Sequence, residues 1–334
     1  MSEEAAAPPE PLKPLKTWSH LAGQRRKPSE YEVVSTNLHY RMNNPESPFE
    51  LNPNNAMNEW YKKYCINSPL KHADWDAFRD PDAIIYRTYN LLQDGQETYV
   101  NGLLEQFAER DHDQTIDGNW VSTLARIYTP SRYLFHTLQM GSAYTGQVAP
   151  SSTITNCCYF QSADSLRWLT HTAYRTKELA NNHPSAGFGA NERSMWENDP
   201  AWQGFREMME KALVAWDWAE SFVAINLIAK PAIEEAVLVQ LGNAARQNND
   251  TLLGMLTQAQ MIDAERHRRW ATALVTMALE VPENRAHLSS LLTKWQPLGD
   301  AAIDAYCAAL PDGANGAAAA AKSATAAFRA GLQV

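Results

Sequence analysis

From residue 82 onward, apolar residues recur every three to four positions, the spacing of helices that bury one face. The first such run contains Ile84, Ile85, Tyr89, Leu92, Tyr99, Leu103 and Leu104. Further helical stretches are predicted at about 118–147, 152–181, 199–230, 232–246, 250–281 and 284–309. Most are separated by helix-breaking sequences, namely Pro150, His183-Pro184, Pro231, Asn249-Asp250 and Pro282. Pro130 and Pro297 fall inside two stretches, so each is expected to kink or split its helix.

The alternation of apolar and polar residues that is typical of strands is nearly absent. Only Tyr31–Tyr40 could pair as a short extended segment. The predicted fold class is therefore all-α, with long helices packed as a bundle.

The first 81 residues differ in composition from the rest of the chain. Ten prolines recur there, at positions 8, 9, 11, 14, 28, 45, 48, 53, 69 and 81, and they exclude long helices. The same region contains nine aromatic residues, among them Trp18, Tyr31 and Trp60, whereas a disordered tail would be poor in aromatics. We interpret residues 1–81 as an extended arm that buries its aromatic side chains on its own body or on another chain.

Two further regions follow the arm. Residues 82–310 form the predicted helical domain. Residues 311–334 are rich in Ala and Gly, and they are either frayed or a docked terminal helix.

Composition and charge narrow the possible partners and location. The 334 residues carry a net charge of −9, with a pI of about 5.5, which argues against a nucleic-acid partner that would need a basic face. No run approaches the ~18 consecutive apolar residues of a membrane span. The acidic segment Met1–Glu10 lacks the features of a signal peptide, so we expect a cytoplasmic protein. The four cysteines, Cys65, Cys157, Cys158 and Cys307, are expected to be reduced and mostly buried.

Two segments that lie 99 residues apart share a polar framework. Gln161–Trp168 and Gln260–His267 carry Gln, Asp and Arg at the same offsets, and each lies within a long predicted helix. A single Asp-x-x-Arg is a common helical ion pair worth a few tenths of a kcal/mol, but two occurrences in register are more specific. Bundles with a di-iron carboxylate centre contain two helices that each present Glu-x-x-His on one face.

On that pattern, the positions of the metal-binding Glu residues fall at Ser165 and Ala264, and those of the His residues at Trp168 and His267. A di-iron centre needs about four carboxylates and two imidazoles, so these residues cannot supply it. Glu220 is a possible remnant of a bridging carboxylate, although an ordinary salt bridge is the favoured interpretation. We therefore expect a degenerate di-iron bundle with no metal and no cofactor in this chain.

The acidic and basic members of the two motifs remain in place. We expect Asp164, Arg167, Asp263 and Arg266 to meet in the bundle interior as a structural polar cluster. The sequence offers no other catalytic motif: the nine histidines form no H-E-x-x-H, and there is no nucleophile elbow, phosphate-binding loop or dinucleotide fingerprint.

Several longer runs resemble one family, the β subunits of the hydroxylase components of toluene monooxygenases, in particular the toluene/o-xylene and toluene para-monooxygenase group. The resemblance covers nearly the whole chain, and its most specific runs are Thr17–Ala22, Lys27–Tyr31, Ser68–His72, Tyr86–Leu91, Leu166–Thr176 and Asp263–His267. It implies a ferritin-like helix bundle that supports a related α subunit, which carries the di-iron centre and the substrate channel.

The resemblance also implies a set of partners. A small γ subunit completes the protomer, two protomers form an (αβγ)2 heterohexamer, and an effector protein, a Rieske-type ferredoxin and a reductase act with it. The complex inserts one atom of O2 into an aromatic ring with electrons from NADH. No catalytic residue can be carried onto this chain. Residues of about 10–80 are expected to wrap over the α subunit, with Trp18, Tyr31 and Trp60 as interface anchors.

Two alternatives stay open at this point. The first is a self-sufficient ferritin-like di-iron oxidase, against which Ser165, Ala264 and Trp168 argue. The second is a stand-alone helical binding protein.

Overall fold

The computed structural model describes residues 27–36, 56–311 and 316–334, and within these ranges every regular element is helical. Short elements come first: α1 (Glu30–Ser35), α2 (Ala56–Tyr61), η2 (Lys62–Ile66) and η3 (Trp75–Ala77). The next are α3 (Tyr86–Ala108), α4 (His112–Thr115), α5 (Gly118–Thr123), η4 (Leu124–Tyr128), α6 (Ser131–Val148), α7 (Ser152–Asn182), α8 (Glu192–Asn198) and α9 (Pro200–Ala212). The last are α10 (Trp218–Phe222), η5 (Val223–Ala229), α11 (Lys230–Ile233), η6 (Glu234–Gln240), α12 (Leu241–Gln247), α13 (Thr251–Ala278), α14 (Glu283–Cys307) and α15 (Ala317–Gly331). The predicted all-α fold is confirmed.

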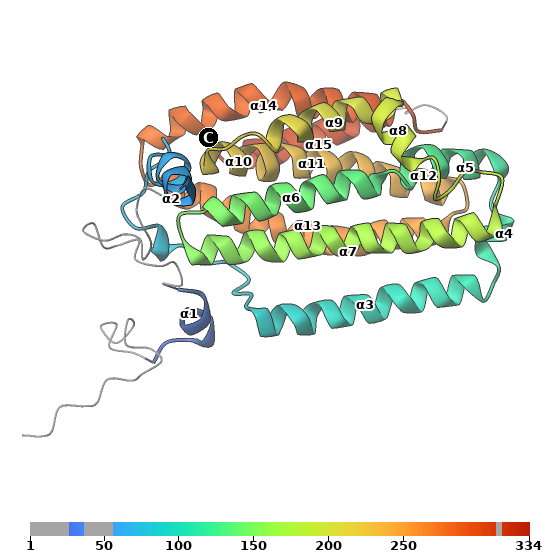
Figure 1. Cartoon of the computed structure of the whole chain (residues 1–334), viewed down its shortest axis with the longest axis horizontal. Coiled ribbons are helices and arrows are strands. Elements are labelled where there is room, and N and C mark those ends of the chain that lie inside the picture. The colour runs from blue at the N-terminus through green and yellow to red at the C-terminus, as the bar shows by residue number, and fades with distance from the viewer. Residues whose placement is uncertain (1–26, 37–55, 312–315) are drawn as a thin grey trace, which may run out of the picture.

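Among the described residues, the centre of the molecule consists of α6, α7, α13 and the continuous helix that runs from α10 through α12. Figure 1 shows α6 and α7 side by side, with α3 along the lower edge and α14 along the upper edge. The helix α14 packs on α9 and η5, and α3 packs on α13. Buried apolar side chains fill the spaces between these helices, including Trp168, Trp202, Trp218 and Trp270.

The expected helix break at Pro231 is wrong. Pro231 lies inside the helix that continues from Trp218 to Gln247, where every residue from Ser221 to Leu238 is buried. A proline removes one N–H donor and crowds the carbonyl four residues earlier. Here the preceding stretch, η5, is a π-helix, whose wider turn accommodates the proline ring without ending the helix. The stretch predicted at 118–147 does split at Pro130, which directly precedes α6, whereas α14 continues through Pro297 without splitting.

The break occurs instead within the stretch predicted at 199–230. The helix α9 ends at Ala212, and α10 begins after Asp217, whose carboxylate accepts hydrogen bonds from the backbone N–H groups of Ala219 and Glu220 at 3.0 and 3.2 Å. Asp is a preferred N-cap residue because it satisfies N–H groups that have no partner in the first turn. The run Trp216–Trp218 is therefore a helix start.

The described part of the arm packs on the chain's own body. Residues Glu30–Ser35 form α1 rather than the extended segment considered for Tyr31–Tyr40, because Ser29 and Glu32 form a capping box. The Ser152 hydroxyl at the start of α7 donates to the carbonyl of Ser35 at 2.6 Å, and the hydroxyl of Tyr31 accepts the backbone N–H of Asp80, near the end of the arm, at 2.9 Å. Residues 37–40 lie outside the described ranges.

Trp60 contacts the body as well. Its indole N–H donates to the Tyr144 hydroxyl at 3.0 Å, and its ring lies 5.2 Å from that of Trp216. Tyr31 and Trp60 thus have partners in their own chain, and their role as anchors for another subunit stays a prediction. Trp18 lies outside the described residues.

The alanine-rich tail contains a docked helix. In α15, Ala321 is fully buried, and Lys322 forms an ion pair with Asp304 of α14 at 2.6 Å. The four cysteines are all buried free thiols.

Candidate functional site

The two related motifs meet in the bundle interior. Asp164 and Arg167 lie on one face of α7, and Asp263 and Arg266 lie on the facing side of α13. The guanidinium of Arg167 contacts Asp263 at 3.1 Å and Asp164 at 3.4 Å. Arg266 forms ion pairs with Asp164 and, at 3.5 Å, with Asp263. The structure thus brings together all four residues that the sequence pattern singled out.

Asp164 is the most heavily bonded member of this group. Its carboxylate is fully buried, and its Oδ1 accepts hydrogen bonds from the Tyr89 hydroxyl at 2.8 Å and the Gln93 amide at 2.7 Å. Its Oδ2 accepts from Arg266 and, at 2.7 Å, from Nε2 of His267. Burial raises the pKa of Asp164, and Arg266 opposes that effect. Each oxygen has at least two donors, so no lone pair is left for a metal ion.

Asp263 closes the opposite side of the cluster. Its Oδ2 accepts from the Trp168 indole at 3.1 Å as well as from Arg167, and its Oδ1 accepts from Gln93 at 2.9 Å. The Gln93 amide therefore bridges the two aspartates, and the side chains around them form one hydrogen-bonded unit.

The contribution of α3 was missed from the sequence. Tyr89, Gln93 and Glu97 recur every four residues, so they share one face of α3 and point toward α7. Glu97 contacts Arg167 at 2.7 Å and His171 at 3.0 Å. Although partial burial opposes the effect, His171 and Arg167 lower the pKa of Glu97. A polar i, i+4, i+8 row on a helix whose other buried positions are apolar was the available signal.

The four positions that the di-iron pattern assigns to ligands have other roles in this structure. The Ser165 hydroxyl donates to the carbonyl of Gln161 on its own helix at 2.9 Å, and Ala264 presents only a buried methyl group. The Trp168 ring is buried and packs edge-on against Phe135, with centroids 5.7 Å apart. His267 donates to Asp164 through Nε2. Burial, followed by the nearby cations Lys230 and Arg266, lowers the pKa of His267 well below its usual value.

A buried lysine lies beside the polar cluster, and no sequence motif predicted it. The ammonium of Lys230 is 5.2 Å from the Trp168 ring centroid and 2.8 Å from the Glu234 carboxylate. Glu234 is also held by Arg268 at 2.6 Å, and although burial opposes the effect, Lys230 and Arg268 lower the pKa of Glu234. Lys230 and Glu234, four positions apart within the largely apolar run 221–238, were the signal for a buried ion pair.

These residues do not fit a di-iron centre. Ser165, Ala264 and Trp168 supply no carboxylate and no imidazole, and the two aspartates are saturated by cationic and neutral donors. The ammonium of Lys230 adds positive charge where a metal would require anionic ligands. Within residues 27–36, 56–311 and 316–334, no three His, Cys, Asp or Glu side chains gather as a metal-binding group. What the cluster can do is hold α3, α7 and α13 together.

Glu220 lies away from this cluster, in the first turn of α10. It forms a salt bridge with Lys294 and accepts the indole N–H of Trp295 at 3.1 Å, both on α14. These contacts agree with the favoured interpretation of Glu220 as a salt-bridge residue.

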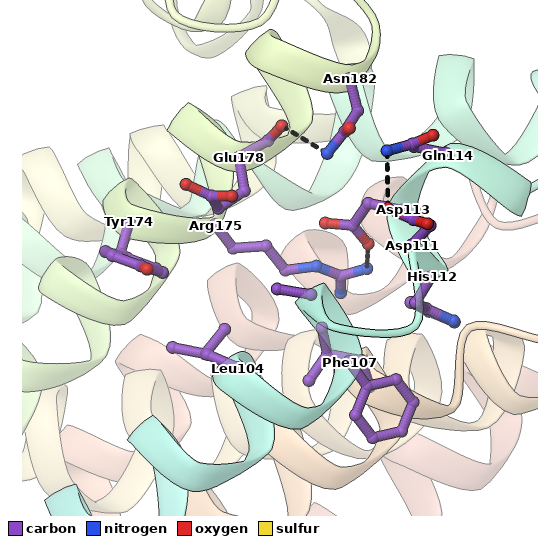
Figure 2. A pocket seen from close by; sticks show the side chains of 12 residues that line it. Leu104, Phe107, Asp111, His112, Asp113, Gln114, Tyr174, Arg175, Glu178 and Asn182 are labelled. Atoms are coloured by element: carbon purple, nitrogen blue, oxygen red, sulfur yellow. Dashed lines mark hydrogen bonds and ion pairs between the residues drawn. The ribbon is translucent and has the colours of Figure 1, made fainter.

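A second buried ion network lies at the far end of α7, beside a pocket of about 190 Å³. Figure 2 shows Arg175 reaching Asp113 across this pocket, at 3.0 Å. Arg175 also binds both oxygens of the fully buried Asp250 at 2.9 Å, and Trp120 donates to the same carboxylate at 2.9 Å. Although burial opposes the effect, Arg175 and His112 lower the pKa of Asp250 far below its usual value. Arg175, Asp113 and Asp250 thus pair with one another, and these ion pairs join α4 and the start of α13 to α7.

Comparison with known proteins assigns the chain to a family. Residues 60–282 match the family described as Methane/Phenol/Alkene Hydroxylase. The chain belongs to this hydroxylase family. It is 58% identical over 301 residues, 90% of this chain and 92% of the relative, to the toluene-4-monooxygenase system hydroxylase component subunit beta of Ectopseudomonas mendocina. It is 24% identical over 267 residues to the phenol 2-monooxygenase oxygenase component MhpL of Acinetobacter pittii (strain PHEA-2), covering 78% of this chain and 74% of that one.

Solved structures of hydroxylase-family proteins agree with the fold. A structure of toluene 4-monooxygenase with toluene bound in its resting active site superposes with a TM-score of 0.86 at 57% identity, covering 90% of this chain and 99% of that chain. Phenol hydroxylase from Pseudomonas sp. OX1 superposes with a TM-score of 0.80 at 19% identity, covering 98% of both chains, and it shows the shared fold alone. None of the helices within residues 27–36, 56–311 and 316–334 combines the length and the apolar composition that a membrane span requires.

Proposed function

We propose that this chain is the non-catalytic β subunit of the hydroxylase component of a multicomponent aromatic monooxygenase of the toluene type. The observation that carries the proposal is the 58% identity, over nine tenths of the chain, to a hydroxylase subunit named beta in a toluene-4-monooxygenase system. Its function is structural: it supports an α subunit that contains the di-iron centre and hydroxylates the aromatic ring with O2.

The polar cluster supports the non-catalytic part of the proposal. Catalysis by a di-iron centre depends on carboxylate and imidazole ligands with open coordination positions. In this chain the Trp168 indole and the Arg167 guanidinium bind Asp263, while Arg266 and His267 bind Asp164. A self-sufficient ferritin-like di-iron oxidase would need carboxylates at positions 165 and 264, and no contact in the described residues favours that alternative.

The proposal includes the assembly that the family resemblance implies. In it the chain pairs with the α subunit and a γ subunit in an (αβγ)2 complex in the cytoplasm. A reductase and a Rieske-type ferredoxin deliver electrons from NADH, and an effector protein regulates the hydroxylase. The aromatic pocket belongs to the α subunit, so substrate preference is not encoded in this chain.

Iron analysis of the assembled hydroxylase tests the proposal. Complexes containing the wild-type chain or the His267→Gln variant should carry the same iron per protomer and oxidise toluene at the same rate, because His267 is the one imidazole at a former ligand position. Glutamine preserves a donor toward Asp164, which keeps the cluster intact. Glu220→Gln is the matched control, because Glu220 is the carboxylate that the sequence offered as a possible metal ligand.

Two results would contradict this function. A loss of iron in the His267→Gln complex would place a metal ligand in this chain. Stoichiometric iron in the chain purified without its partners, together with O2 consumption, would support the self-sufficient oxidase instead.

A further inference from the structure

The helix α3 is separate from the two main hydrophobic cores of the molecule. Among the described residues, the buried apolar side chains of those cores come from elements such as α6, α7, α13 and α14, and none comes from α3. The helix α3 contributes instead to a small separate cluster on α13, whose buried members are Val100, Leu103, Leu104, Leu252, Leu256 and Ala259. All α3 members of that cluster lie in the second half of the helix. Residues 86–97, the first half, take part in no apolar cluster that the structure describes.

The first half of α3 is bound to the two buried aspartates by hydrogen bonds. Its buried side chains are Tyr89 and Gln93. The Tyr89 hydroxyl donates to Asp164 at 2.8 Å, and the Gln93 amide donates to Asp164 at 2.7 Å and to Asp263 at 2.9 Å. The Tyr89 ring also stacks on Phe160, with centroids 4.7 Å apart. Because water can take over such hydrogen bonds when the helix moves away, their net contribution to holding it in place is small.

The other contacts of this half lie close to solvent. Glu97 accepts a hydrogen bond from Arg167 at 2.7 Å and pairs with His171 at 3.0 Å, but the Glu97 side chain is 38% exposed. At the start of α3, Arg87 pairs with Glu30, and both side chains are more than half exposed. Exposed ion pairs contribute little to stability because the surrounding water screens them. Residues 86–97 are therefore held mainly by polar contacts.

The opposite end of α3 is bound to the body by different contacts. The apolar cluster on α13 holds the second half, and Asp111, with a φ of 51°, separates α3 from α4. In α4, Asp113 pairs with Arg175 of α7 at 3.0 Å, as Figure 2 shows. His112 of α4 contacts Asp250, which precedes α13, at 3.2 Å. Figure 1 shows α3 along one edge of the bundle with α4 beyond its end, so the two ends of α3 differ in what opposes their release.

We propose that α3 is a hinged helix whose detachable segment, residues 86–97, opens away from the Asp164–Asp263 cluster while its second half and α4 stay bound. Opening would let water solvate the charged groups of the cluster, whereas release of the second half would expose its apolar side chains to water. Segments with few buried apolar contacts are the ones that open locally before the rest of a protein unfolds. The inference goes beyond the proposed function and does not depend on it, because every contact involved lies within this chain.

Hydrogen–deuterium exchange in the assembled hydroxylase tests the proposal. Helices shorter than ~12–15 residues are only marginally stable in water, so the amides of residues 86–97 should lose their helical hydrogen bonds and exchange once the segment detaches. In the wild-type protein these amides should exchange about tenfold or more faster than those of the facing segments, 161–170 of α7 and 259–270 of α13. Residues 103–107 should exchange more slowly than residues 86–97.

Removing the hydrogen bonds of the detachable segment gives a second readout. The double variant Tyr89→Phe/Gln93→Leu deletes three hydrogen bonds and keeps two side chains of similar size. It should accelerate exchange at residues 86–97 about tenfold or more and leave exchange in α7 and α13 unchanged. Tyr306→Phe is the matched control, because it removes a buried tyrosine hydroxyl that donates to the Ile127 carbonyl at 2.9 Å, away from α3. This control should leave exchange at residues 86–97 unchanged.

The outcomes separate a hinged helix from one that unfolds together with the bundle. Acceleration confined to residues 86–97 in the double variant would support the proposal. Wild-type exchange at residues 86–97 that is as slow as in the facing segments would overturn it. Equal acceleration of α3, α7 and α13 in the double variant, or no acceleration at all, would overturn it as well.

Discussion

Replacing Asp164 by Asn should test how much the buried polar cluster stabilises the fold. The amide oxygen can still accept hydrogen bonds from Tyr89 and Gln93. The amide NH2, however, takes the place of Oδ2, where Arg266 and His267 both point donors at the carboxylate. His267 can move its proton to the other ring nitrogen, but a guanidinium has no acceptor form. Arg266 therefore loses its nearest carboxylate and keeps only the longer contact with Asp263, at 3.5 Å.

The magnitude follows from the burial of this pair. Asp164 is fully buried and the Arg266 side chain is 7% exposed, so water cannot replace the lost partner. Removing one member of a buried ion pair costs about 3–5 kcal/mol. A chain of this length has an unfolding entropy of roughly 0.7 kcal/mol/K near its melting temperature, so the melting temperature should fall by about 4–7 °C.

The measurement is differential scanning calorimetry on wild-type and variant protein prepared in the same assembly. Asp304→Asn is the matched control, because Asp304 is 52% exposed and pairs with Lys322 at the surface. Exposed ion pairs contribute about 0–1 kcal/mol, so this variant should melt within about 1–2 °C of the wild type. The double variant Asp164→Asn/Arg266→Met should recover part of the loss, since it also removes the cation that has lost its nearest carboxylate. Equal melting temperatures for Asp164→Asn and Asp304→Asn would refute the reasoning.

Two further predictions concern helix packing and pH. Gly204→Ala should destabilise the protein by about 1–3 kcal/mol, because the new Cβ would lie 2.6 Å from the backbone Cα of Ala302. Gly95→Ala should instead stabilise the protein by about 0.5–1 kcal/mol, since no atom lies within 4 Å of a Cβ at that position. Urea unfolding of both variants checks these opposite signs. Because the pKa of His267 is lowered by folding, the unfolded chain takes up a proton near pH 6.5 and the folded chain does not. The free energy of unfolding should therefore be largest above pH 6.5, and at lower pH it should decrease by up to about 1.4 kcal/mol per pH unit. His267→Gln should flatten this dependence between pH 6.5 and pH 5, and unchanged slopes for wild type and variant would contradict the burial of a neutral imidazole.

Local pattern was sufficient for the helices but not for every boundary. The three-to-four spacing of apolar residues reports the buried face of a helix, and it located α3, α6, α7, α13 and α14. It failed at Pro231 because the response of a helix to proline depends on the turns around it, here the π-helical η5. It also missed the helix start at Asp217, whose capping hydrogen bonds are a local feature that the surrounding aromatic residues obscured.

The residue types around the repeated Asp-x-x-Arg motif were enough to establish that positions 165, 168 and 264 carry neither a carboxylate nor an imidazole, because ligand chemistry depends on residue type alone. Only the tertiary structure decided what surrounds these positions. Gln93 and Lys230 come from helices far from both motifs in the sequence, yet they reach the two aspartates and the Trp168 ring. Burial and charge compensation are properties of the packed bundle, since they depend on which helices face one another.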